Sequence, residues 1–93
     1  MSISCYLVDS NGVGDERDFP FTFKDLIDTC KEIGPISDAP ESSVIGRLLF
    51  ADSVIDAKEL YRAASLFDGF SLSAHTLEVL SMIKEEALTS NEF

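Results

Sequence analysis

The strongest local constraint on this fold is one amphipathic segment with clear signals at both ends. Thr22 is a good helix N-cap, and Asp25 lies three residues later, as in a capping box. Gly34 and Pro35 end the segment. Between these ends, apolar residues recur on one helical face: Phe23, Leu26, Ile27, Cys30 and Ile33. The pattern predicts a helix over residues 23–33 that must bury this face against a core.

The residues before this helix predict β-structure. Residues 3–8 are β-branched, aromatic and aliphatic, which is typical of a strand. Residues 9–15 contain Asn-Gly and are rich in turn formers, so they predict a loop. Residues 18–21 can return as a second strand, which Pro20 would confine to a sheet edge. We therefore expect an N-terminal strand or β-hairpin.

The second half of the chain predicts further helices. Residues 44–50 suit a short helix, although a buried strand has the same short apolar pattern. Residues 53–56 form a second capping-box pattern, which opens a helix that ends at residues 68–69. Ser71 or Ser73 caps a last helix. The expected fold class is α+β and mostly helical, with the N-terminal strand or hairpin packed on three to four helices.

The composition combines high charge with a full core. The chain has 17 Asp+Glu and 7 Lys+Arg, a net charge of -10, yet 45% of it is hydrophobic. Disordered acidic segments lack this apolar content, so residues 1–93 are expected to form one acidic globular domain. The charge is spread along the sequence: residues 1–46 hold nine acids and three bases, and residues 47–93 hold eight acids and four bases. Such a surface favours basic partners.

No catalytic or metal motif is complete. Counted from Asp9, the fifth and twelfth positions of a calcium loop would be Val13 and Pro20, which are not ligands. His75 is the only histidine, and no Gly-x-Ser-x-Gly motif is present. We therefore expect a non-enzymatic protein without metal or cofactor.

Compartment and partner class follow from the cysteines and the basic residues. Cys5 and Cys30 are predicted to be reduced core thiols, and no signal peptide is expected, which indicates a cytoplasmic protein. The seven Lys and Arg are scattered among acids, which disfavours direct nucleic-acid binding and anionic membranes. The sequence leaves the oligomeric state open.

Residues 52–60 resemble the Asp-Ser-Leu attachment site of acyl and peptidyl carrier proteins, which are also small, acidic and helical. The resemblance implies that Ser53 opens a helix and carries a phosphopantetheine group. This chain departs from the pattern by one extra residue after the serine and by its N-terminal strand. A serine that caps a helix explains the same residues without any family. A carrier-like or scaffold subunit is therefore the alternative function.

Two groups of carboxylates are predicted to form the partner-binding surface. One is a stripe on the helix over residues 23–33, and the other lies in the loop before it. Their members are Asp25, Asp28 and Glu32, and Asp15, Glu16 and Asp18. The hypothesis is that both groups share one face and antagonise a basic, nucleic-acid-handling protein, as immunity proteins and phage anti-defence or anti-CRISPR inhibitors do. On this hypothesis, reversing the stripe to lysine abolishes binding and preserves the fold. A solvated helix face and charge for solubility alone are the alternatives.

Overall fold

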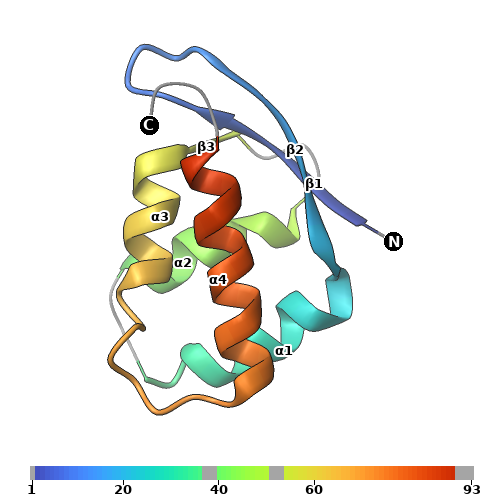
Figure 1. Ribbon diagram of the computed structural model, residues 1–93, viewed down its shortest axis with the longest axis vertical. Helices are drawn as coiled ribbons and strands as arrows, with labels where there is room; N and C mark the ends of the chain where they lie inside the picture. The colour runs from blue at the N-terminus through green and yellow to red at the C-terminus, as the bar shows by residue number, and fades with distance from the viewer. Residues whose placement is uncertain (1, 37–39, 51–53, 90–93) are drawn as a thin grey trace.

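A computed structural model describes residues 2–36, 40–50 and 54–89. In it, a β-sheet packs against a layer of helices (Figure 1). The order of the helices and strands along the chain confirms the expected fold class, which is α+β and mostly helical with an N-terminal hairpin. The elements are β1 (Ser2–Val8), β2 (Gly14–Thr22), α1 (Phe23–Ile33), α2 (Pro40–Gly46), the 3-10 helix η1 (Arg47–Leu49), β3 (Val54–Asp56), α3 (Ala57–Ser65) and α4 (Ala74–Leu88).

The sheet has the strand order β2-β1-β3. β1 pairs antiparallel with β2 and parallel with β3. Pro20 therefore lies on an edge strand, as its missing N–H requires. The hairpin turn is held by the Asp9 carboxylate, which accepts the N–H groups of Asn11 at 2.8 Å and Val13 at 3.0 Å. Gly12 adopts a φ of 78°, the left-handed conformation that favours glycine.

Gly14 is the point of closest approach between the hairpin strands. An added Cβ there would meet the Leu7 carbonyl oxygen and lie 2.7 Å from Val8 Cα. Nonbonded carbons normally stay about 3.5–4.0 Å apart. Glycine at this position therefore allows the hairpin to keep its register.

Two predicted boundaries are wrong. β2 begins at Gly14 rather than at residue 18, so Asp15 and Glu16 lie in a strand and not in a loop. The polar side chains of Asp15 and Glu16 lack the apolar alternation by which a strand is identified from sequence. The strand forms nevertheless, because its pairing with β1 depends on backbone groups. The helix expected after Ser53 begins at Ala57 instead.

The segment before α3 explains that second difference. Val54–Asp56 forms β3, in which β-branched side chains suit parallel pairing with β1. Asp56 then caps α3, and its carboxylate accepts the Glu59 N–H at 3.1 Å. Ser53 itself lies outside the described residues. For residues 44–50, the preferred helix is confirmed as the end of α2 followed by η1.

The core lies between the sheet and the helices. The inner face of β1 contributes Ile3, Cys5 and Leu7, and that of β2 contributes Phe19 and Phe21, all of them buried. Both cysteines are free thiols; Cys5 is buried and Cys30 is half-buried. α4 contacts α1, α3 and β2 and so joins the two layers. Of the two candidate caps of the last helix, Ser73 is the one used.

Candidate functional site

The predicted acidic stripe on α1 is built into the fold. The capping box is present, since Asp25 N–H donates to Thr22 Oγ1 at 3.1 Å and Thr22 N–H donates to Asp25 Oδ2 at 2.9 Å. The Thr22 backbone N–H, followed by its hydroxyl, holds the pKa of Asp25 below its ordinary value. His75 Nε2 of α4 lies 3.2 Å from the other Asp25 oxygen. Asp25 therefore completes the capping box of α1 and contacts α4.

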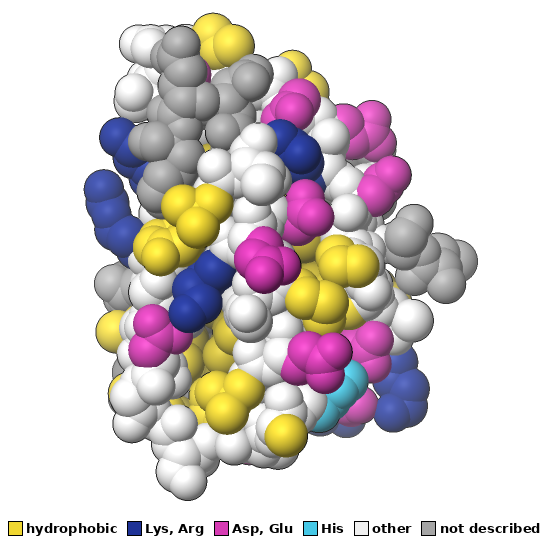
Figure 2. Space-filling view, in the orientation of Figure 1, with side chains coloured by type: hydrophobic (Ala, Val, Ile, Leu, Met, Phe, Trp, Pro, Cys, Tyr) yellow, Lys and Arg dark blue, Asp and Glu magenta, His cyan; other side chains and the backbone are white. Residues whose placement is uncertain are grey.

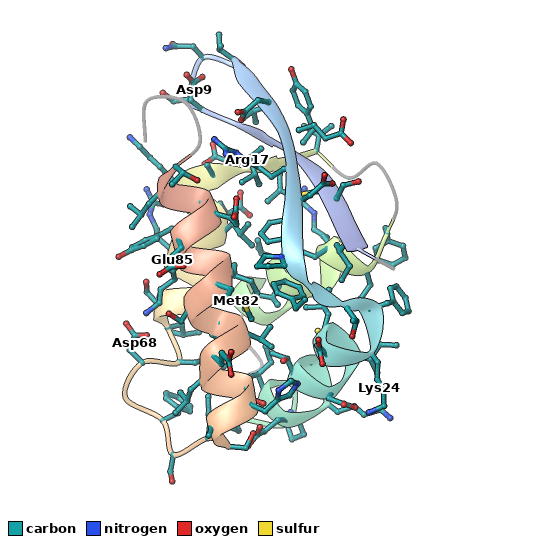
Figure 3. The ribbon with its side chains drawn as sticks, turned by 45° about the vertical axis from the view of Figure 1, so that its right-hand side comes forward. Asp9, Arg17, Lys24, Asp68, Met82 and Glu85 are labelled. Atoms are coloured by element: carbon teal, nitrogen blue, oxygen red, sulfur yellow. The ribbon has the colours of Figure 1, made fainter. Side chains whose placement is uncertain are left out.

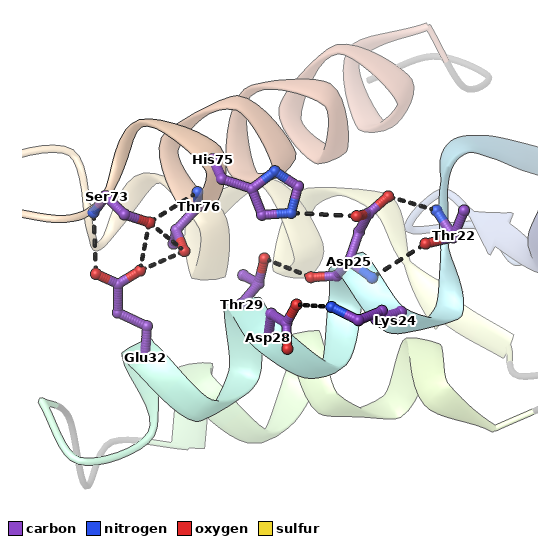
Figure 4. Close-up of polar contacts among 9 residues, drawn as sticks. All are labelled: Thr22, Lys24, Asp25, Asp28, Thr29, Glu32, Ser73, His75 and Thr76. Atoms are coloured by element: carbon purple, nitrogen blue, oxygen red, sulfur yellow. Dashed lines mark hydrogen bonds and ion pairs between the residues drawn. The ribbon is translucent and has the colours of Figure 1, made fainter.

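Glu32 performs a similar role for α4 (Figure 4). Its carboxylate accepts the Ser73 N–H at 2.9 Å, the Ser73 hydroxyl at 2.8 Å and the Thr76 hydroxyl. The Thr76 hydroxyl, followed by the Ser73 N–H and hydroxyl, lowers the pKa of Glu32. A carboxylate at this place also suits the positive end of the α4 helix dipole. Glu32 thus connects the end of α1 to the start of α4.

Asp28, the third member of the stripe, pairs with Lys24 at 3.0 Å on the same helix. Two of the three acids in the stripe therefore form polar contacts between α1 and the start of α4. Reversing Asp25 and Glu32 to lysine would remove the carboxylates that bond to the N-cap residues of α1 and α4, so the triple reversal tests folding as well as binding. The expectation that it preserves the fold conflicts with these contacts.

Strand alternation separates the second group of carboxylates. Asp15 lies 3.1 Å from Arg17 on one side of β2. Arg17 reaches toward α4, where it bonds the Thr89 carbonyl and lies 4.0 Å from Glu86 (Figure 3). Glu16 and Asp18 point to the opposite, exposed side. The six predicted acids are thus not gathered on one face, and only Glu16 and Asp18 are exposed and outside any hydrogen bond or ion pair among the described residues.

The fold nevertheless concentrates charge that the sequence disperses. β2 and α4 each contain three acids and one base, which sum to six acids and two bases. Both bases already have acidic partners. Arg17 pairs with Asp15, and the Lys84 ammonium lies 2.7 Å from the Asp68 carboxylate. α3, in contrast, contains one acid and two bases. Figure 2, viewed onto α4, shows magenta carboxylates distributed over this helix and the adjoining strand.

Sequence reasoning missed two exposed acids on α4. Glu78 and Glu85 are exposed on α4, and neither has an ion-pair partner among the described residues. Figure 3 shows Glu85 on the side of α4 turned away from the sheet. Their spacing of seven residues puts them on one side of a helix, two turns apart. That spacing was the signal in the sequence that could have identified them as a pair on one side of the helix. We call Glu16, Asp18, Glu78 and Glu85 the unpaired carboxylates.

The described residues also bear on metal binding, membrane spanning and the carrier resemblance. Within residues 2–36, 40–50 and 54–89, no group of three or more His, Cys, Asp and Glu side chains could hold a metal ion. In the same ranges, no helix has the length and apolar character needed to cross a membrane. The residues after Ser53 form β3 rather than the helix that the carrier resemblance implies.

Comparisons of this chain with protein-family models, curated proteins and solved structures found no match. Function is therefore inferred from the surface alone.

Proposed function

We propose that this chain is a small non-enzymatic protein that binds a basic partner and blocks its function. Proteins that act in this way include immunity proteins and phage-encoded inhibitors of host defence, such as anti-CRISPR proteins. The observation that carries the proposal is the set of unpaired carboxylates on β2 and α4, beside cations that are already engaged. The basic partner is expected to be a protein that handles nucleic acid, because such proteins expose Lys and Arg for phosphates.

The amount of charge favours docking on a local basic patch. The longest extent of the molecule is 34 Å. A DNA duplex of that length carries about 20 phosphate charges at one per roughly 1.7 Å, whereas the whole chain has a net charge of -10. Glu78 and Glu85 lie about 10 Å apart along the helix axis at a rise of about 1.5 Å per residue. The unpaired carboxylates can therefore replace a few phosphates and not a length of duplex.

The test is inhibition of a captured partner. Immobilised chain is incubated with a lysate of the organism that encodes it, and retained proteins are identified and purified. The proposal predicts a basic protein whose nucleic-acid binding or cleavage falls when the chain is added. The variant Glu16→Lys/Asp18→Lys/Glu78→Lys/Glu85→Lys is expected to lose this effect, because the changed side chains are exposed and opposite charges drive association.

A matched control reverses charge elsewhere on the surface. Lys58 and Arg62 are exposed on α3, and Lys58→Glu/Arg62→Glu is expected to retain inhibition. Equal inhibition by the carboxylate variant and the native chain would contradict the proposed role of the unpaired carboxylates. A partner that is captured and not inhibited would contradict antagonism.

A further inference from the structure

The sheet has one face that no described helix covers. Along β1, Ile3, Cys5 and Leu7 face the core, whereas Ser4 and Tyr6 face outward. This outer face holds a shallow groove of about 290 Å³, lined by Ser4, Cys5, Tyr6, Glu16 and Val54. Small-molecule pockets usually span roughly 300–1,000 Å³. The groove is therefore at the lower limit for a small molecule and suits a single side chain of a partner.

The groove crosses all three strands in one row. Tyr6 of β1 is directly opposite Glu16 of β2 and Val54 of β3. Tyr6 is 43% exposed and Val54 is 57% exposed, so both side chains are accessible to a partner. The row thus presents an aliphatic group, an aromatic ring and a carboxylate in sequence.

The tyrosine ring is held in place before any partner arrives. Its hydroxyl donates to the Gly14 carbonyl oxygen of β2 at 2.9 Å. Because this bond joins the tip of the side chain to the neighbouring strand, the ring leans over the sheet. A fixed aromatic side chain loses little conformational entropy on binding, which favours its use as an anchor.

The charge of this face is negative. Asp18, opposite Ser4, adds a second carboxylate beside Glu16. Among the described strand residues, no Lys or Arg points outward, since Arg17 turns toward α4. Arg47 lies at the edge of β3, where it donates to the Val54 carbonyl oxygen at 3.2 Å and lies 3.8 Å from Glu59.

We propose that this groove binds an arginine side chain of the basic partner. The guanidinium stacks on the Tyr6 ring and donates to the Glu16 carboxylate, while the aliphatic stem lies on Val54. Arginine fits better than lysine because its planar group stacks on aromatic rings and donates two parallel hydrogen bonds to a carboxylate. The assignment rests on the proposed function, since it names the chemistry by which the basic partner is recognised.

The experiment uses defined peptides, so it does not depend on finding the natural partner. Hexa-arginine and hexa-lysine are titrated into the ¹⁵N-labelled chain, and amide shifts are followed residue by residue. The largest saturating shifts are expected at Ser4, Tyr6, Glu16 and Val54, with hexa-arginine binding about threefold more tightly than hexa-lysine. Glu16→Gln is expected to weaken hexa-arginine binding about fivefold, and Tyr6→Ala about threefold.

Two further variants serve as controls. Glu85→Gln removes an unpaired carboxylate from α4 and is expected to leave the shifts in the groove unchanged. Tyr6→Phe keeps the ring, loses the hydroxyl bond and is expected to retain arginine preference, so it separates stacking from any disturbance of the fold caused by Tyr6→Ala.

The outcomes separate the groove from the proposed function. Equal binding of both peptides, or largest shifts on α4, would overturn the groove and leave antagonism through the unpaired carboxylates standing. Arginine-selective shifts in the groove together with no inhibited partner would support the groove and contradict the proposed function.

Discussion

Replacing Gly14 with alanine places a methyl group where β1 and β2 leave no room. The new carbon would lie 2.7 Å from Val8 Cα and from the Leu7 carbonyl carbon. An ordinary contact of about 3.5 Å requires these carbons to separate by at least about 0.8 Å, and the Leu7 carbonyl oxygen, which is closer still, must move further. Strand hydrogen bonds of about 2.9 Å cannot stretch that far and persist. The end of the hairpin must open, and we expect a loss of about 2–4 kcal/mol in the free energy of unfolding.

Urea denaturation followed by far-UV circular dichroism measures this loss. The matched control is Gly46→Ala at the end of α2, where an added Cβ meets nothing within 4 Å. Alanine is the better helix former, so this control is expected to gain up to about 1 kcal/mol. Gly14→Ala as stable as the native chain would refute the close approach of the strands. The variant should also shift the amides of Tyr6 and Glu16, because the hairpin aligns both residues in the groove.

Three other predictions concern acid stability, the core and thiol reactivity. Glu32 has a folded-state pKa below its ordinary value of 4.5, so its contribution is full above that pH and is lost as pH falls through the folded pKa. Glu32→Gln should therefore be less stable than the native chain at pH 7 and equal to it in strong acid; a pH-independent difference contradicts this role. Phe67 is 0% exposed and Phe70 is 40% exposed, so Phe67→Ala should cost about 3–5 kcal/mol and Phe70→Ala less than half of that by urea denaturation. Burial raises the pKa of Cys5 to about 12, so its thiol should react with Ellman's reagent only as the chain unfolds; rapid labelling in native buffer would contradict its burial.

The elements that could be predicted from sequence are those whose signals are local. α1 begins and ends where Thr22 and Gly34 place its boundaries, since capping depends on residues within four positions. Ser73 caps α4 for the same reason. β3 was missed because three residues form a strand only by pairing with β1, some fifty positions earlier in the chain. The sequence pattern around residue 53 could not reveal that pairing.

The candidate surface was harder to predict for the same physical reason. Whether a carboxylate is available to a partner depends on contacts between distant segments, such as that of Glu32 with Ser73, 41 positions away. Asp25 and Glu32 looked like part of an exposed stripe because helical periodicity predicts which side of a helix a residue lies on. It does not predict which other segment packs against that side. Glu16 and Asp18 remain exposed because strand alternation turns them to the outer side of the sheet.

The most direct test of electrostatic docking is the rate of association with the captured basic partner as a function of salt. We expect the rate constant of the native chain to fall by about tenfold or more between low and high ionic strength, because salt screens the attraction that steers the two proteins together. Glu16→Lys/Asp18→Lys/Glu78→Lys/Glu85→Lys should associate slowly at every salt concentration, and Lys58→Glu/Arg62→Glu should follow the native chain. A rate constant that is independent of salt for the native chain, or unchanged in the carboxylate variant, would contradict electrostatic docking through the unpaired carboxylates.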